Sequence, residues 1–369
     1  MIDSVVSRVS EFELKRERIL GLMDKQNWDW VVISSISGFS WATGGGRSYI
    51  NTFDIKGVAS LLYSRDRTVL LTSNVEMPRL KDEEVDGLPL EFAVLPWHEA
   101  YFEPDEGISG IIKGTVAADI SIPGTIDGNR ELMKLRLDLL GVEQERLADL
   151  CRETSESIQE VARKFQPLQT EFEVASAMAE ELNGKAILSP VLLVASDERL
   201  FRHRHPLPTN KEIERYAMLV ASTTRYGLYC SVTRLVHFGA LPVELAEKSE
   251  VCANIDASYL SSTVPGSRLQ DVLAVGKKAY SDWGYPDEWK LHHQGGLAGY
   301  ASREIFAGSP EDWKINAGQC FAWNPSIAGV KSEDTILTKE SEPEVLTVST
   351  EWPMIDTYLE VKRPGILVR

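Results

Sequence analysis

The sequence has few cysteines, no long apolar run and no excess of positive charge. Its four cysteines are far apart and form no Cys-x-x-Cys pair, which argues against a disulfide scaffold or zinc knuckle and favours a reducing compartment. No run of about 18 apolar residues occurs, and the charged segment after Met1 lacks the apolar core of a signal peptide. We therefore expect a cytoplasmic protein without a membrane partner.

The excess charge is negative, with a formal net charge of -16. An acidic surface repels nucleic-acid phosphates and anionic lipids, so neither is an expected partner. Hydrophobic residues make up 43% of the chain and charged residues 25%, which is typical of a globular protein with a large core. Because a single core stops growing at roughly 250–300 residues, 369 residues predict two domains.

The apolar pattern divides the chain near residue 142. Residues 1–142 begin with a helical pattern over 10–25 and continue with strand-like runs, among them 58–63, 68–72 and 91–95. Residues 143–369 begin with a long amphipathic helix, and Thr170 with Glu173 forms a capping-box pattern for the next one. This mixture predicts an α/β (α+β) protein of two domains, 1–142 and 143–369.

Four stretches of the second half carry the most specific patterns. They are Phe-Arg-His-Arg-His-Pro at 201–206, the strand pair at 219–234 that ends in Thr-Arg, His-His-Gln-Gly-Gly to Arg-Glu at 292–304, and Gly-Gln-Cys-Phe-Ala-Trp-Asn-Pro to Glu-Asp-Thr at 318–335. In this order they resemble the creatinase/aminopeptidase P/prolidase family. The resemblance implies a small N-terminal creatinase-like α/β domain, a C-terminal pita-bread domain, and a homodimer in which the small domain completes the neighbouring cleft.

The sequence departs from this family at the metal ligands. Metal-dependent members use two Asp, one His and two Glu to hold two divalent ions. The two Asp positions fall on Val220 and Ser231, the first Glu position falls on Asn324, and only Glu333 clearly remains. Valine cannot ligate a cation, and serine and asparagine are weak neutral ligands. We therefore expect no bound metal and no cofactor.

Histidines are the candidate catalytic groups. Of six in the chain, four lie in two of these stretches: His203, His205, His292 and His293. The unperturbed pKa of histidine, about 6.5, suits acid/base catalysis near neutral pH. We predict that these four are catalytic, and that Glu333 acts with them as an acid/base or orients one of them. Purely structural roles for the histidines and for Glu333 stay open.

The resemblance also implies substrate-binding residues. Arg303 and Glu304 match a pair that helps to hold a substrate carboxylate in creatinase-like members, since a guanidinium offers a planar fork to that group. A loop-closing salt bridge is the alternative. Arg47 follows a Gly-Gly-Gly run and is expected to reach the cleft from a partner's small domain. The motifs themselves supply Tyr229, Ser231, Tyr300 and Asn324.

Three functions follow from these patterns. The first is a metal-independent, creatinase-like hydrolase or lyase that breaks a C–N bond in a small carboxylate-bearing substrate by histidine acid/base catalysis. The second is a non-catalytic pseudo-peptidase module that binds a partner. The third is an Xaa-Pro aminopeptidase or dipeptidase with an unusual single metal held by histidines and Glu333. Creatine itself is a doubtful substrate, because Ser231 and Asn324 stand where creatinases place glutamates.

Overall fold

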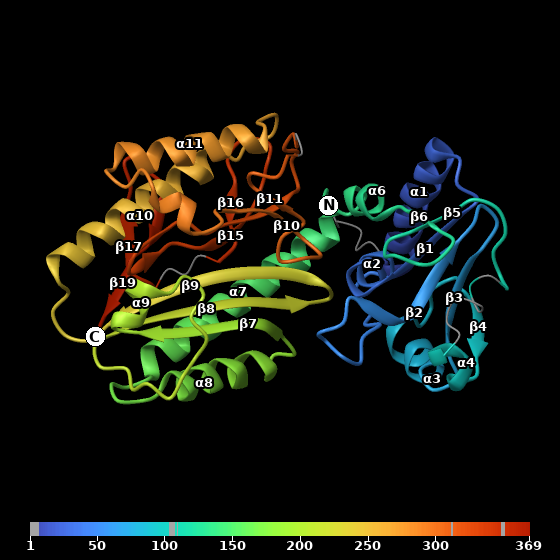
Figure 1. Ribbon diagram of the computed structural model, residues 1–369, viewed down its shortest axis with the longest axis horizontal. Helices are drawn as coiled ribbons and strands as arrows, with labels where there is room; N and C mark the ends of the chain where they lie inside the picture. The colour runs from blue at the N-terminus through green and yellow to red at the C-terminus, as the bar shows by residue number, and fades with distance from the viewer. Residues whose placement is uncertain (1–6, 103–107, 109, 311–312, 348–350) are drawn as a thin grey trace, which may run out of the picture. The chain divides into compact units, whose positions relative to one another are not determined.

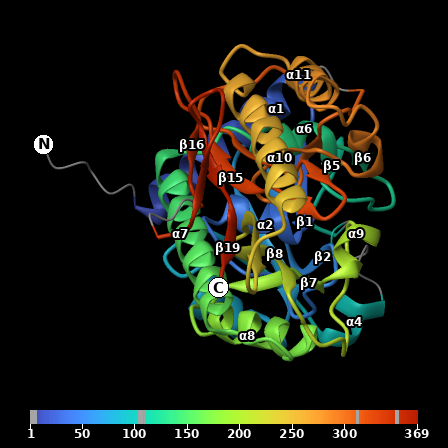
Figure 2. The ribbon, with the colours of Figure 1, turned by 90° about the vertical axis from the view of Figure 1, so that its left-hand side faces the viewer.

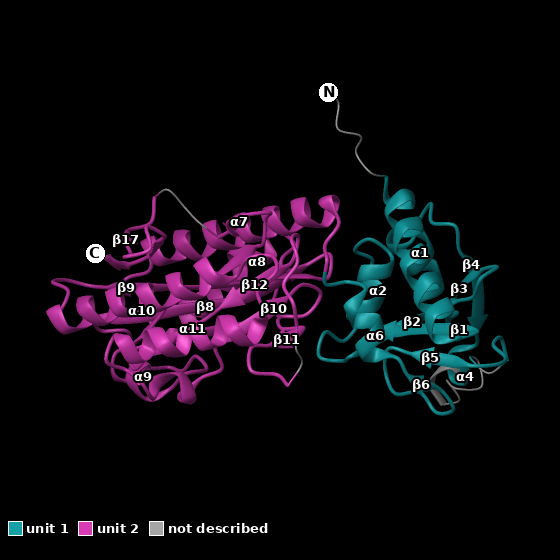
Figure 3. Ribbon diagram, turned by 90° about the horizontal axis from the view of Figure 1, so that it is seen from above, with its two compact units in different colours: residues 1–137 teal, residues 138–369 magenta. Residues whose placement is uncertain are grey.

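The computed structural model divides the chain into two compact units, residues 1–137 and 138–369 (Figure 3). It describes residues 7–102, 108, 110–310, 313–347 and 351–369. The division lies five residues before the predicted boundary at 142, which falls inside the first turn of helix α7 (Gly141–Lys164). In the described ranges no helix combines the length and apolar character needed to cross a membrane.

Unit 1 is built on a six-stranded mixed sheet with the strand order β4-β3-β2-β1-β5-β6. Strand β1 pairs antiparallel with β2 and parallel with β5. The helix expected over 10–25 and the strands expected over 58–63, 68–72 and 91–95 are present as α1, β2, β3 and β4. The elements of this unit are α1 (Arg8–Gln26), β1 (Trp30–Ser35), α2 (Ile36–Ala42), β2 (Lys56–Tyr63), β3 (Thr68–Ser73), α3 (Met77–Arg79), η1 (Leu80–Glu84), β4 (Glu91–Leu95), α4 (Trp97–Phe102), β5 (Val116–Ala118), β6 (Ile126–Asp127) and α6 (Asn129–Lys134).

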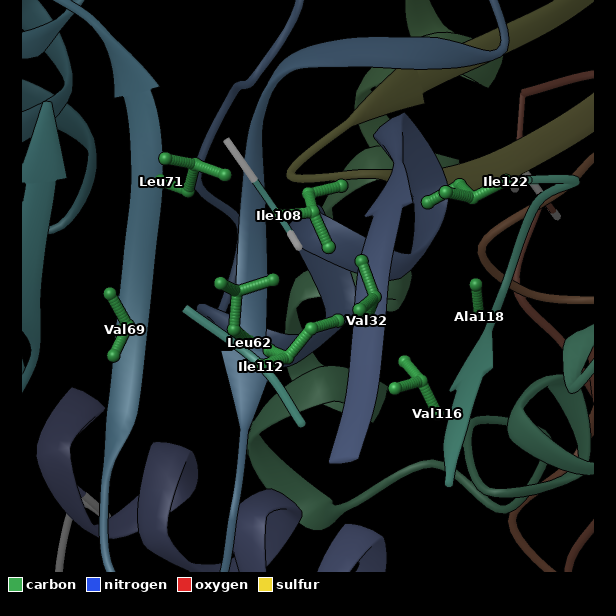
Figure 4. Packing of buried hydrophobic residues seen from close by; sticks show 9 residues of the cluster. All are labelled: Val32, Leu62, Val69, Leu71, Ile108, Ile112, Val116, Ala118 and Ile122. Atoms are coloured by element: carbon green, nitrogen blue, oxygen red, sulfur yellow. The ribbon is translucent and has the colours of Figure 1, made fainter. Parts of the chain in front are cut away.

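The core of unit 1 forms on this sheet. Figure 4 shows nine buried apolar residues from the strands and the segments beside them: Val32, Leu62, Val69, Leu71, Ile108, Ile112, Val116, Ala118 and Ile122. Helix α1 packs against β1 and β2 and buries Phe12, Ile19 and Met23 completely. Residues on one face of a strand alternate with those on the other, so this core follows from the strand pattern of the sequence.

Unit 2 contains two main sheets, with strand orders β19-β9-β8-β7 and β11-β10-β12-β15-β16. Helices α7 and α8 pack on the first sheet, while α10 lies beside α11 and packs on β12 of the second (Figures 1 and 2). This is the layered arrangement that the resemblance implies. Its elements are α7 (Gly141–Lys164), α8 (Glu171–Asn183), β7 (Leu188–Ser196), α9 (Glu198–Arg202), β8 (Tyr216–Arg225), β9 (Leu228–His237), α10 (Val243–Ser262), α11 (Leu269–Asp282), η2 (Glu288–Leu291), β10 (Gly295–Ala298), β11 (Ile305–Phe306), β12 (Cys320–Trp323), β13 (Ser326–Ile327), β14 (Val330–Lys331), β15 (Asp334–Leu337), β16 (Glu344–Val345), β17 (Met354–Asp356), β18 (Lys362–Pro364) and β19 (Ile366–Val368).

Local signals explain several of these boundaries. Thr170 caps α8 by accepting a hydrogen bond from the backbone N–H of Glu173, and the Glu173 side chain returns the bond, as the capping-box pattern predicts. Residues 320–327 form two strands, β12 and β13, with Asn324 and Pro325 between them. Proline has no backbone N–H and therefore interrupts a strand that pairs on both sides.

A buried ionic network joins the two sheets of unit 2 next to Glu333. Asp334 accepts hydrogen bonds from Arg234 of β9 at 3.0 Å and from Arg363 of β18 at 2.5 Å. Arg363 also donates to Asp256 of α10 at 2.7 Å. All four side chains are almost completely buried, and each charge has an opposite neighbour. The network fixes the start of β15 and therefore the backbone that carries Glu333.

Candidate active site

Three histidines from two distant segments of unit 2 meet at one place. His205 lies in the segment that follows α9, whereas His292 and His293 lie between η2 and β10. One nitrogen from each of the three imidazoles lies within 4.8 Å of the other two. The Nε2 atoms of His205 and His292 are 2.9 Å apart. We call these three residues the histidine triad.

The glycines that follow the triad place it against the sheet. Gly295 has φ +101°, a conformation that side-chain-bearing residues rarely adopt, and a Cβ there would lie 2.1 Å from the carbonyl oxygen of Ala322. Strand β10 pairs with β12 through Gly295 and Trp323, and with β11 through Gly296 and Phe306. The His-His-Gly-Gly pattern of the sequence therefore marks the point where histidines enter a tightly packed sheet.

The surroundings of the triad favour neutral imidazoles. Burial lowers the pKa of His292 to about 2, and the positive charge of Lys331 adds to this effect. Partial desolvation of the His293 ring and the positive charge of Arg303 lower the pKa of His293 to about 4. Partial desolvation and then Lys331 also lower the pKa of His205. At neutral pH, all three rings therefore carry an unprotonated nitrogen with an available lone pair.

Glu333 lies beside this cluster, but its carboxylate is already occupied by protein cations. Its Oε2 accepts hydrogen bonds from Thr233 and from Lys331, each at 2.7 Å, and its Oε1 lies 3.4 Å from an Arg303 nitrogen. Burial opposes ionisation of Glu333, but Lys331 and Arg303 outweigh it and lower its pKa to about 2. Glu333 is therefore ionised and paired at any physiological pH.

The remaining positions of the two-metal centre do not fit two divalent ions. Val220, Ser231 and Asn324 are all buried, and none supplies a carboxylate. Ser231 Oγ accepts a hydrogen bond from Arg303 at 3.3 Å, and Ser222, its partner across the β8–β9 pair, lies 3.4 Å away. Because neutral ligands and two fixed cations now occupy this region, a pair of dications has neither the donors nor the negative charge that it needs.

The other predicted site residues divide into three groups. Arg303 and Ser231 join the Glu333 cluster, and Asn324 Oδ1 is buried without a hydrogen-bond partner among the described residues. Tyr300 donates to Glu143 of α7 at 2.5 Å, and the backbone N–H of Tyr300 donates to Glu304, so both side chains hold the loop between β10 and β11. The backbone N–H of Tyr229 donates to Gly299 of the same loop.

His203 and Arg47 are not part of the cluster. His203 is exposed at the end of α9, and the structure does not place it with the triad. Arg47 belongs to unit 1, where it pairs with Glu84 at 2.8 Å. The chain bends at Arg204 and His205, directly after His203, so these two histidines are not held on one side of an extended segment.

A pocket of about 460 Å³ opens beside two of the triad residues, His292 and His293. Lys277 and Trp289 also line it, and the Lys277 ammonium lies 3.9 Å from the centre of the Trp289 ring. The volume is within the range of small-molecule sites. Lys277 gives the pocket a positive charge, which suits an anionic ligand.

Sequence reasoning missed three residues of this site: Lys331, Ser326 and Lys277. Lys331 ends the short strand β14 and stands two residues before Glu333, and this Lys-x-Glu spacing places both side chains on one side of an extended chain. That signal was available. Ser326 Oγ lies 3.2 Å from His292 Nδ1, and Lys277 belongs to helix α11. Neither residue could be found from the sequence, because no local pattern connects it with the histidines.

Comparison with known proteins agrees with this architecture. The sequence profile of metallopeptidase family M24 matches residues 145–340, more than half of the chain. The chain belongs to metallopeptidase family M24. This confirms the family and the fold that the sequence motifs predicted. The family is one of metallopeptidases.

Two relatives show how far the sequence likeness extends. An uncharacterized peptidase of Staphylococcus haemolyticus is 24% identical over 338 residues, which cover 81% of this chain and 92% of that protein. An uncharacterized peptidase of Staphylococcus epidermidis is 29% identical over 130 residues, which cover 33% of this chain and 36% of that protein. This second likeness therefore spans about a third of the relative.

Solved M24-type structures share the fold at low sequence identity. The prolidase from Pyrococcus horikoshii OT3 gives a TM-score of 0.77 at 17% identity and covers 91% of this chain and 98% of its own. The N-terminal domain of the FACT complex subunit SPT16 from chickpea gives 0.72 at 12% identity and covers 92% and 96%. At such identities the likeness concerns the fold alone.

Proposed function

We propose that this chain hydrolyses a C–N bond in a small carboxylate-bearing substrate, without the metal pair that M24 peptidases hold on carboxylates. In this reaction water adds OH to the carbon and supplies the proton that leaves with the nitrogen. The histidine triad is the place where the water is activated. This proposal agrees with the creatinase-like hypothesis from the sequence on one point. Divalent ions held by carboxylates take no part in the reaction.

One observation carries this proposal. Glu333, the retained ligand position, is neutralised by Lys331 at 2.7 Å, whereas three unprotonated imidazoles lie next to it. A scaffold without chemistry has no need for three converging imidazoles, two of which line a pocket. The titratable groups of the site therefore support an enzyme over a passive binding module.

The pocket supports the choice of substrate. Lys277 lines the pocket. Beside the triad, the buried charges of Lys331, Arg303 and Glu333 sum to +1. A positive site attracts and orients a carboxylate. Both guanidinium ends of Arg303 already donate, to Ser231, Ser302 and Glu333, so the free carboxylate of the substrate is assigned to Lys277.

A substrate screen tests the function. The full-length protein is incubated with mixtures of dipeptides, N-acyl amino acids, amidines and ureido acids, and product amines are detected by mass spectrometry. We expect turnover of a substrate that carries a free carboxylate, and a loss of at least about 100-fold in kcat for His293→Gln. Turnover only of neutral substrates would contradict the carboxylate assignment.

Lys277→Met separates binding from chemistry. This variant should raise KM by about 10-fold or more with little change in kcat, because Lys277 contacts the part of the substrate that does not react. Lys278→Met is the matched control, since Lys278 is the neighbouring, exposed lysine of α11 and pairs with Asp282. If no hydrolysis occurs with any class of amide, and the protein instead retains a macromolecular ligand, the binding-module alternative replaces the enzyme.

A further inference from the structure

We infer that the histidine triad binds one transition-metal ion, at a position distinct from the carboxylate-held metal pair of M24 peptidases. The inference rests on the proposed function only in placing the reaction at these imidazoles. Nitrogen atoms of His205, His292 and His293 converge within 4.8 Å, and the nearest two are 2.9 Å apart. Two nitrogens bound to one zinc ion at about 2.0–2.1 Å in tetrahedral geometry lie about 3.3 Å apart. Small rotations of the three side chains would bring their nitrogens to this separation.

A hydrogen bond to Ser326 prepares His292 for this role. Its Nδ1 lies 3.2 Å from Ser326 Oγ, which also accepts a hydrogen bond from Arg204 at 3.0 Å. With the Nδ1 proton directed at Ser326, Nε2 keeps its lone pair, and it is Nε2 that points at His205. Metal-binding histidines usually have such a partner on the second nitrogen, because it fixes the tautomer and the ring orientation.

The site also has an opening to solvent. His292 is buried, whereas His205 and His293 are exposed, so an ion and a water molecule reach the converging nitrogens from outside. The ring of His293 packs edge-on against Phe306, with 5.2 Å between the centroids. Three protein ligands and one open position are the pattern of catalytic rather than structural zinc sites.

The donor set determines which ions bind. Imidazole nitrogen suits zinc, cobalt, nickel and copper, while magnesium and calcium prefer oxygen ligands. The nearby charges of Lys331 and Arg303 are only partly cancelled by Glu333, which further disfavours ions that are held mainly by electrostatic attraction. We therefore assign the triad to one divalent ion among cobalt, nickel, copper and zinc. We expect the affinity to rise from cobalt through nickel to copper and to be lower for zinc than for copper.

Direct metal titration tests the inference independently of activity. Untagged full-length protein is treated with a chelator, dialysed, and titrated with cobalt(II), whose visible d–d absorption reports the ligand geometry, and then with zinc(II) by calorimetry. We expect one ion per chain, a tetrahedral cobalt spectrum, and no heat from magnesium. Less than half an equivalent of zinc or cobalt at saturation, or a second equivalent with the same affinity, would overturn the inference.

Variants locate the ion. His205→Gln and His293→Gln replace exposed side chains, so both should fold, and each should weaken zinc binding by at least about 100-fold. His203→Gln is the matched control, because His203 is exposed two residues from His205 and lies outside the triad. Equal affinity in all three variants would show that the ion binds elsewhere.

Activity then distinguishes the two proposals. Zinc binding that depends on the triad, in a protein that hydrolyses nothing, leaves the metal site standing and removes the proposed function. Full hydrolysis in chelator-treated protein that is lost in His293→Gln, together with no saturable zinc or cobalt binding in the titration, leaves the proposed function standing and removes the metal site.

Discussion

The Lys331 ammonium lies 2.7 Å from the Glu333 carboxylate, and both side chains are only 5% exposed. Glu333 is the one carboxylate that this chain keeps at the ligand positions of the M24 two-metal centre. A cation supplied by the chain itself therefore occupies a carboxylate that would otherwise attract an ion from solution. Burial makes this pair strong only while both partners are present, because an unpaired buried charge is costly.

The Lys331–Glu333 pair can be tested through stability. Glu333→Gln should reduce the free energy of unfolding by about 3–5 kcal/mol, since it leaves Lys331 and Arg303 buried without a counter-charge, and Lys331→Met should reduce it less, since Arg303 still lies 3.4 Å from Glu333. The double variant should lose less than the sum of the two, because neither charge then remains alone beside the other position. Denaturant unfolding of all four proteins gives the coupling energy. Simple additivity would mean that the two charges do not interact.

The triad makes stability depend on pH. The pKa of His292 is about 2 in the folded chain and about 6.5 in the unfolded chain. Between about pH 6.5 and pH 2 the unfolded chain therefore binds a proton on His292 that the folded chain does not bind. The free energy of unfolding falls as the pH drops below about 6.5. A single such group contributes up to about 1.4 kcal/mol per pH unit.

Chelator-treated protein unfolded by urea between about pH 7 and pH 5 should show this slope, and His292→Gln should reduce it. His98→Gln is the control, since His98 is exposed in unit 1. A slope that is unchanged in His292→Gln would show that His292 binds a proton equally well in the folded chain.

Gly295 should tolerate no side chain. Gly295→Ala places a Cβ 2.1 Å from the Ala322 carbonyl oxygen at φ +101°, so both backbone strain and overpacking oppose it. We expect a loss of about 3 kcal/mol or more in the free energy of unfolding. Gly284→Ala is matched in conformation, with φ +86°, but its Cβ meets no atom within 4 Å. Thermal unfolding should show the smaller loss, about 1 kcal/mol, for Gly284→Ala.

The two histidines of the His-Arg-His stretch should differ once a substrate is known. His205→Ala should lower kcat by at least about 100-fold, as should His293→Ala, because both rings belong to the triad. His203→Ala should change kcat by less than about 3-fold, within the range of an exposed side chain that contacts no substrate. Steady-state kinetics on the three variants decides between them. A large loss in His203→Ala would restore His203 as one of the four histidines that the sequence predicted to be catalytic.

The expected homodimer has a simple signature. Light scattering should give a mass near twice 41.2 kDa for the intact chain. If Arg47 completes a neighbouring site, Arg47→Ala should reduce kcat/KM without changing that mass, whereas its pairing with Glu84 alone predicts an effect confined to stability. A fully active monomer would remove Arg47 from the site.

Much of the architecture was predictable from the sequence. The helix over 10–25, the strand over 91–95 and the Thr170 cap depend on local apolar spacing and local hydrogen bonds, so they appear where the pattern places them. The motifs predicted the M24 fold, and Val220, Ser231 and Asn324 are the reason to expect no two-metal centre. These conclusions depend only on which residue occupies each position, and they need no knowledge of distances between side chains.

The composition of the site depended on distances that only the tertiary structure sets. His205 meets His292 because the segment after α9 is held against β13, where Arg204 bonds to Ser326, more than 100 positions further along the chain. His203 is two residues away, yet it remains in solvent. The sequence determined which groups are available for chemistry, whereas the packing of unit 2 decided which imidazoles converge, because His205 and the His292–His293 pair lie on segments whose separation along the chain carries no information about their separation in space.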